Sequence, residues 1–259
     1  MENNPSKSLD ILGIKPISDA INAVTMAAVT SAQELFNRIC FPVAEEFGQY
    51  LKDRVHLYRI SNLTKIANKS RLMLDARFSP DIKVGAHPRL VHQIIENGSW
   101  ADTDEVQSMW AGLLTSSCSE DANDDSNLIF INLLKQLTSL EAKILNHVCM
   151  NSEKKLTKTG LIFPQQLIIP IKELQKISGV NDIHRLDREL DHLRSMELVV
   201  MGFDMLRQDD NVDVTPTALA VNLYVRCQGM IISPVEYFGL TNDGQAKESK
   251  ESGSDASIA

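Results

Sequence analysis

The 259-residue sequence has few of the patterns by which enzymes and metal-binding domains are recognised. Its four cysteines stand far apart, and no two have the short spacing that a zinc site or a redox motif needs. The 12 glycines are scattered and form no phosphate-binding loop. Nucleophile–base pairs and paired carboxylates have no local signature either. We therefore expect no catalytic residue, no metal ligand, no cofactor and no enzyme activity, although a site assembled from distant residues would leave no such pattern.

Long hydrophobic runs are also missing. The longest charge-free stretch near the start, residues 20–33, contains polar side chains and is shorter than the roughly 20 residues that cross a bilayer. The first residues lack the apolar core and the cleavage site of a secretory signal. These absences predict a cytoplasmic protein. A helix in this stretch would pack on the following region or, alternatively, lie peripherally on the inner membrane.

Basic residues are outnumbered, since 26 Lys and Arg stand against 34 Asp and Glu and give a formal net charge of -8. Such a chain has no overall attraction for nucleic acid or anionic lipid, so a partner of that kind must meet a local basic patch. One segment qualifies, because residues 54–74 contain five cations and no carboxylate. The cations are Arg54, Arg59, Lys65, Lys69 and Arg71.

On a helix, Arg54, Lys65 and Lys69 would lie within about 60° of one another and form a cationic stripe. With Arg59 and Arg71 nearby, this stripe is our candidate contact surface for phosphates of nucleic acid, for lipid headgroups or for another partner. Over this contact role we favour the interpretation that the cations pair with the acidic segment at residues 81–127 or are simply solvated.

Capping signals predict helices in the middle of the chain. Proline at the start and glycine at the end delimit a helix over residues 88–98. The next helix begins at a capping pair, Asp102 and Glu105, and carries apolar residues on one face. These are Val106, Met109, Trp110, Leu113 and Leu114. We expect Trp110 to be a core residue.

The carboxy-terminal third is patterned as a winged helix. Thr138 and Glu141 form a capping box, which predicts the first helix of this region. The sequence IPIKELQKISG then predicts a second helix, with Gly179 in the tight turn of a helix-turn-helix. Asn181 or Asp182 caps a third helix. Its leucines repeat at helical spacing, and we expect Leu186, Leu190 and Leu193 to be buried.

A wing follows the third helix. Residues 198–203 predict a strand, residues 207–213 a hairpin tip, and Val212 and Val214 the returning strand. Thr215 and Pro216 are then expected to cap a final helix, which carries Leu219, Leu223 and Cys227.

A winged helix suggests DNA binding, but the charges of this one argue against it. The third helix carries as many carboxylates as cations, and the wing carries Arg207 against Asp209, Asp210 and Asp213. Such a surface is repelled by a phosphate backbone. We therefore favour a structural or protein-binding winged helix, with a DNA-binding regulator as the alternative. The spacing of His184 and His192 on the third helix does not suit a shared metal ion and predicts a solvated face.

Together these patterns predict a mainly α protein with four regions. An amphipathic helical segment is expected at residues 1–40 and a helical region at residues 41–126. A winged-helix region with a small β-hairpin is expected at residues 127–239, followed by a disordered tail at residues 240–259.

Four stretches of the chain, in this order, carry a family resemblance. They are FPVAEEFGQYLKDRVHLYRISNLTKI at Phe41 to Ile66, VQSMWAGLLTSS at Val106 to Ser117, INLLKQLTSLEAKILNHV at Ile131 to Val148, and VTPTALAVNLYVRC at Val214 to Cys227. On these stretches the chain resembles the abortive infection alpha family over most of residues 40–228. The tryptophan helix followed by LKQLTSLEAKIL is the most specific part.

The resemblance implies a role in bacterial defence against phage, in which an infected cell halts or dies before phage are released. It implies no catalytic residue, no trigger and no target. We expect the protein to act by binding a protein partner. The alternatives are a DNA-binding regulator that uses the winged helix, and a membrane-perturbing effector that uses residues 17–41 with the cationic stripe beside it. The oligomeric state stays open.

Overall fold

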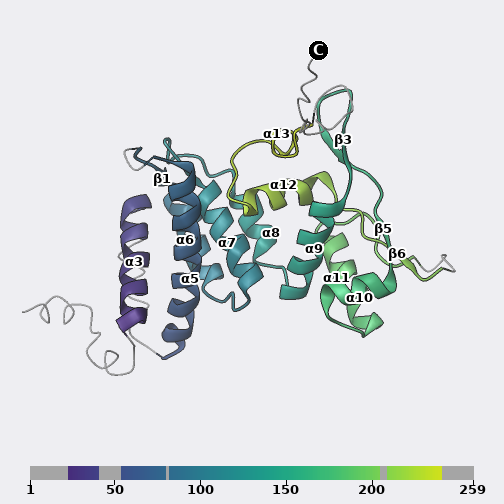
Figure 1. The fold of residues 1–259 in the computed structure, drawn as a ribbon, viewed down its shortest axis with the longest axis horizontal. Helices are drawn as coiled ribbons and strands as arrows, with labels where there is room; N and C mark the ends of the chain where they lie inside the picture. Colours follow the sequence, from purple (N-terminus) through teal and green to yellow (C-terminus); the bar gives the residue numbers. More distant parts are fainter. Residues whose placement is uncertain (1–22, 41–53, 80–81, 205–208, 241–259) are drawn as a thin grey trace, which may run out of the picture.

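The computed structural model describes residues 23–40, 54–79, 82–204 and 209–240. These residues form an elongated, mainly helical molecule with short antiparallel strand pairs, as Figure 1 shows, so the predicted mainly α fold is confirmed. Three expectations fall outside the described residues. They concern the tip of the wing at Arg207, the tail beyond residue 240, and the first part of the amino-terminal segment.

Four helices stand side by side at the amino-terminal end of the molecule (Figure 1). They are α3 (Ala23–Ile39), α5 (Arg54–Arg77), α6 (Pro88–Gly98) and α7 (Asp104–Ser116). The bounds of α6 are those that its proline and glycine predict. The short strands β1 (Gly85–Ala86) and β2 (Cys118–Ser119) pair antiparallel beside these helices.

The apolar side of α3 faces α5. Leu35, Phe36 and Ile39 are buried there, because α3 packs along α5. For the described part of this helix, the expectation that it packs on the following region is therefore confirmed. Among the residues that the structure describes, no helix is long and apolar enough to cross a membrane.

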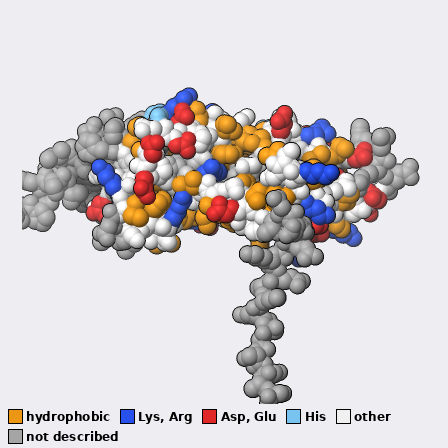
Figure 2. Space-filling view, turned by 90° about the horizontal axis from the view of Figure 1, so that it is seen from above, with side chains coloured by type: hydrophobic (Ala, Val, Ile, Leu, Met, Phe, Trp, Pro, Cys, Tyr) orange, Lys and Arg blue, Asp and Glu red, His pale blue; other side chains and the backbone are white. Residues whose placement is uncertain are grey.

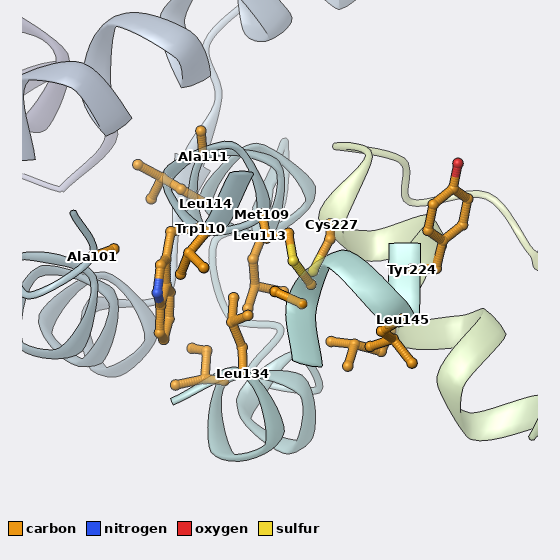
Figure 3. Packing of buried hydrophobic residues seen from close by; sticks show 14 of the residues in the cluster. Ala101, Met109, Trp110, Ala111, Leu113, Leu114, Leu134, Leu145, Tyr224 and Cys227 are labelled. Carbon is orange, nitrogen blue, oxygen red and sulfur yellow. The ribbon is translucent and has the colours of Figure 1, made fainter. Parts of the chain in front are cut away.

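The α7 helix runs through the centre of the core. Trp110 is buried in it, as predicted (Figure 3). The predicted capping pair is wrong, because Thr103 and not Asp102 occupies the N-cap, and Thr103 makes no side-chain hydrogen bond to the helix. Its hydroxyl donates instead to Ser139 Oγ at 3.3 Å, which ties the start of α7 to the start of a later helix.

That later helix is α9 (Ser139–Asn151), which follows α8 (Leu128–Leu134). The predicted capping box at its start is confirmed. Thr138 Oγ1 accepts a hydrogen bond from the Glu141 amide at 3.1 Å, and the Thr138 amide donates to Glu141 Oε2 at 2.7 Å. Two backbone donors at the start of the helix are thereby satisfied.

The helix α12 (Ala218–Cys227) joins the two ends of the molecule, because it packs on both α7 and α9. Its crossing with α7 is so close that a Cβ on Gly112 would lie 1.7 Å from the Cys227 carbonyl oxygen. Only glycine permits this approach. Around the crossing, Met109, Leu113 and Leu145 belong to one core that extends through both ends (Figure 3).

The carboxy-terminal end contains α9, two further helices and two strand pairs (Figure 1). These elements are β3 (Lys154–Leu156) with β4 (Ile162–Pro164), β5 (Ile168–Pro170) with β6 (Asn211–Asp213), α10 (Ile171–Ser178) and α11 (Ile183–Ser195). Gly179 ends α10 in the left-handed conformation, with φ of 73°, and Asp182 caps α11. The three leucines of α11 are fully buried, as predicted. A short helix, α13 (Pro234–Tyr237), follows α12.

The strand expected at residues 198–203 is present only as two single bridges, Val199 to Pro216 and Gly202 to Asp213. Gly202 has a φ of 103°, which interrupts the extended conformation that a continuous strand requires. Asp213 also pairs with Ile168 of β5, so residues 199–202 lie on the other side of β6 from β5. The predicted returning strand is confirmed as β6.

Thr215 and Pro216 do not cap the final helix, contrary to the sequence prediction. Thr217 is the N-cap of α12, and its hydroxyl accepts a hydrogen bond from the Ala220 amide. Thr215 is engaged elsewhere, since its hydroxyl oxygen accepts from the Leu167 amide at 2.8 Å.

The crossing of α7 and α12 makes a testable prediction. Gly112→Ala forces a methyl group into the Cys227 carbonyl, so we expect a loss of more than about 3 kcal/mol of unfolding free energy, the upper end for ordinary overpacking. Gly98→Ala is the matched control, because its Cβ would meet Ile66 and Trp110 at 3.3 Å and these side chains can shift. Urea unfolding measures both, and equal stability of the two variants would contradict the close crossing.

Candidate interaction surfaces

The five cations predicted as a contact surface fall on α5, but they do not share one environment. Arg59 is only 8% exposed. Its Nε donates to Ser99 Oγ at 2.8 Å, and its Nη2 to Glu96 Oε2 at 3.1 Å. The guanidinium also lies 4.8 Å from the centre of the Trp100 ring. Arg59 therefore ties α5 to the end of α6.

Lys69 also has partners within the protein. Its amine donates to Asp104 Oδ1 at 2.6 Å and to Ser108 Oγ at 2.7 Å, both on α7. Asp104 belongs to the acidic segment that we considered as the alternative partner of the cations. Lys65 and Arg71 are exposed and lie about 120° apart around the helix.

The side chain of Arg54 lies outside the described residues. The structure thus places Arg59 and Lys69 in contacts between helices and leaves Lys65 and Arg71 facing solvent. Their contact with an anionic partner stays a prediction.

Arg59 offers a test of this structural role. Arg59→Lys replaces the planar guanidinium by a single amine, which cannot make the contacts to both Ser99 and Glu96 in the same geometry. We expect the unfolding free energy to fall by about 1–3 kcal/mol. Lys65→Ala removes an exposed cation from the same helix and should stay within about 0.5 kcal/mol of the unmodified protein. Equal unfolding midpoints for these two variants in urea would show that Arg59 makes no net structural contribution.

A buried carboxyl group links α9 to α11. The Glu141 side chain is 0% exposed, and its Oε1 lies 2.6 Å from His192 Nδ1. Nearby, Thr138 Oγ1 donates to Glu189 Oε2 at 2.8 Å. Burial raises the pKa of Glu141, while hydrogen bonds from the Thr138 amide and from His192 act against this rise. The His192 side chain is 40% exposed, so it contacts both Glu141 and solvent, and His184 is exposed.

The raised pKa of Glu141 has a consequence for stability. Because the folded state holds a proton that the unfolded state has lost, stability falls as the pH rises from the ordinary value of 4.5 through the folded pKa. Glu141→Gln does not titrate and keeps a residue suited to the capping box. We expect its melting temperature to decline less over this range, whereas Glu153→Gln, at an exposed carboxyl, should follow the unmodified protein. Parallel pH profiles for Glu141→Gln and the unmodified protein would refute this assignment.

A polar cleft of about 740 Å³ lies where the two ends of the molecule meet. It is lined by residues from α5, α7, α9 and α12, and a neighbouring pocket of about 520 Å³ shares Glu105, Lys143, Asn146 and Gln228 with it. Asn146 Nδ2 donates to Glu105 Oε1 at 3.2 Å across the cleft. Cys227 is among the lining residues but is only 2% exposed, and burial raises the pKa of its thiol well above the usual range. A buried thiol of this kind is protonated at neutral pH.

The other described cysteines are also buried. Burial raises the pKa of Cys118 and of Cys149 to about 12. Over the described ranges, no group of three histidine, cysteine or carboxylate side chains is placed to hold a metal ion.

Exposed apolar side chains gather on the outer side of the carboxy-terminal strands. We call this surface the apolar face, and its residues are Phe163, Ile168 and Val200, of which Ile168 pairs with the pocket residue Asp213. Phe163 is 57% exposed and Val200 54%, although both are large hydrophobic residues. They line a pocket of about 410 Å³ together with Pro164, Pro216 and Ala218. Large exposed apolar side chains beside a pocket favour an interaction site.

Strand geometry explains why these side chains are exposed. Ile169 of β5 points inward and is 5% exposed, so its neighbour Ile168 must point outward, since successive strand residues face opposite sides. Beneath the pocket, Gln166 Nε2 donates to Asp213 Oδ2 at 2.9 Å, and Asp213 lies beside Ile168 across the strand pair. Sequence reasoning missed this surface, because apolar residues in short strands look like core residues.

The charges on α11 are largely paired with one another. Arg194 Nη2 lies 2.7 Å from Asp191 Oδ1, and Arg185 Nε lies 3.6 Å from Glu189 Oε1. On the face of the molecule seen in Figure 2, basic and acidic side chains are interspersed among hydrophobic ones. The described residues on that face form no continuous positive area of the kind that a phosphate backbone requires.

A comparison with protein-family models gives a match over residues 58–239 to the family described as abortive infection alpha. The matched range begins within α5 and runs past α13, so it contains the polar cleft and the apolar face. No curated protein and no solved structure matches the chain.

Proposed function

Because the chain belongs to the abortive infection alpha family, we propose that it is a bacterial phage-defence protein that acts by binding a protein partner and not by catalysis. The observation that carries this proposal is the apolar face. Phe163 and Val200 are large, exposed and adjacent to a pocket, and burying such a side chain in an interface contributes about 1.5–3 kcal/mol. A partner that covers the face therefore gains binding free energy from several side chains at once.

The chemistry of the described clefts is consistent with binding. The thiols of Cys118, Cys149 and Cys227 are buried with raised pKa values, and Asn146 hydrogen-bonds to Glu105 across the polar cleft. A thiol of this kind lacks the lowered pKa that a nucleophilic cysteine needs at neutral pH.

The proposal includes a winged helix in the carboxy-terminal region. The order of elements supports it, since α9 and the strand pair β3–β4 are followed by β5, α10, α11, the bridged residues 199–202 and β6. In space β6 lies between β5 and residues 199–202, and the buried leucines of α11 hold this helix on the core. A third helix held in this way is the element with which DNA-binding winged helices enter the major groove.

The alternatives find less support in the contacts. A DNA-reading helix needs donors free to meet bases and phosphates, but Arg185 and Arg194 of α11 pair with Glu189 and Asp191. A membrane-perturbing helix needs an uncovered apolar side, whereas the described apolar side of α3 packs on α5. We therefore place the function at the apolar face.

Phage protection tests the proposal. Val200→Asp and Phe163→Ser each disrupt the apolar face at an exposed position, so we expect both to abolish protection without lowering the melting temperature. Ile129→Asp is the matched control, because Ile129 is 61% exposed on α8, and an acidic residue near a helix start is tolerated there. The measurement is plaque formation on cells that carry the native gene with its neighbours. Undiminished protection in both variants would overturn the proposal.

A further inference from the structure

We infer that the apolar face binds an extended segment of a partner protein, in which alternating apolar residues are flanked by lysine or arginine. The inference rests on the proposed function and adds the chemistry of the partner. It follows from an open strand edge, from the pocket beside that edge, and from the charges at both of its ends.

The open edge belongs to residues 199–202. Val200 N donates to Thr215 O at 2.9 Å, and Gly202 N donates to Asp213 O at 2.8 Å. The backbone groups of these two residues therefore point toward β6 and the residues that follow it. The backbone groups of Met201 alternate with them and point away from β6. Met201 is 43% exposed, and within the described residues its amide and carbonyl have no backbone partner.

The edge is short, since Gly202 interrupts it, but it lacks the side chains that keep strands from pairing. Natural edge strands carry lysine, proline or inward-pointing charges, which prevent another chain from adding to the sheet. Residues 198–203 read Leu-Val-Val-Met-Gly-Phe and contain none of these. The segment therefore offers one apolar strand edge to an extended chain.

The pocket adds side-chain selectivity to this edge. Val200 directly precedes Met201 and lines the 410 Å³ pocket with Phe163, Pro164 and Pro216. An extended chain that pairs at Met201 directs every second side chain to the outer side of the strands, where the pocket lies. Alternating apolar residues in the partner would thus enter the pocket or cover Phe163.

Both ends of the edge are acidic. Glu197 is exposed just before it, and the acidic segment at residues 203–213 follows it, where Asp209 and Asp210 are exposed. Basic residues on either side of the partner's apolar core complement these charges. A second copy of this chain fits poorly, because antiparallel pairing about residues 200–201 sets Glu197 of one copy beside the acidic segment of the other.

Peptide binding to the full chain tests this inference by fluorescence anisotropy. The probe is a labelled peptide with a Val-Thr-Val-Thr-Val core and two lysines at each end. A second peptide carries glutamates in place of the lysines, and a third carries proline in place of the central valine, which removes a strand hydrogen bond. We expect the lysine peptide to bind, and the other two to bind at least about tenfold more weakly.

Variants of the chain locate the binding. Val200→Asp and Phe163→Ser should each weaken binding of the lysine peptide by about tenfold or more, and Ile129→Asp should leave it unchanged. Two variants are used, so that a folding defect in one does not decide the result. Circular dichroism confirms that each is folded.

Several outcomes would overturn the inference. One is failure of the lysine peptide to bind, and another is equally tight binding of the glutamate or proline peptide. A dimer in sedimentation that Val200→Asp dissociates would also overturn it, because the occupant would then be a second copy of this chain. Loss of phage protection in Val200→Asp without any peptide binding would leave the proposed function standing and remove only this inference. Retained protection in both variants would remove the proposed function itself.

Discussion

Gly112 brings the backbone of α7 against the backbone of α12, and this approach sets the relative position of the two ends of the molecule. A Cβ at this position would overlap the Cys227 carbonyl, so the helices can cross here only because α7 carries glycine in the middle of an apolar run. The chain runs from β6 into α12 through residues 214–217, and Asp213 and Pro216 form the bridges to residues 199–202. The location of the apolar face relative to α7 therefore depends on this crossing.

Buried polar contacts then fix the orientation of the helices that surround the crossing. Arg59 ties α5 to α6, and Glu141 with His192 ties α9 to α11. Polar groups in such positions must find their partners or leave an unsatisfied charge in the core, so they disfavour other arrangements of the same helices. The result is a rigid support on which exposed side chains such as Phe163 and Val200 keep a defined position.

Local signals in the sequence predicted much of the fold. The proline and glycine of α6, the capping box at Thr138 and the turn at Gly179 act within a few residues of one another, so their effect can be recognised without knowledge of the tertiary structure. The burial of Trp110 followed from helical periodicity for the same reason. The family resemblance found in the sequence is also that of the matching family model.

Features that depend on distant residues could not be predicted in this way. A glycine inside a helical pattern gives no indication that another helix will cross at Gly112, and a pair such as Glu141 and His192 joins residues far apart in the chain. The same limit applies to the cations of α5, because only the folded chain brings Lys69 to Asp104. The apolar face was missed since Ile168 and Ile169 look alike in sequence, and the pairing of β5 with β6 decides which one faces solvent.

Our central claim is that a protein partner covers the apolar face during phage defence. Placing a photo-reactive amino acid at position 200 in infected cells tests it most directly, with position 129 as the control. We predict a discrete crosslinked adduct from position 200 only. The adduct should be lost when Phe163→Ser is added, and the partner fragment in it should be an apolar segment flanked by basic residues. No adduct from position 200, or equal adducts from both positions, would contradict it.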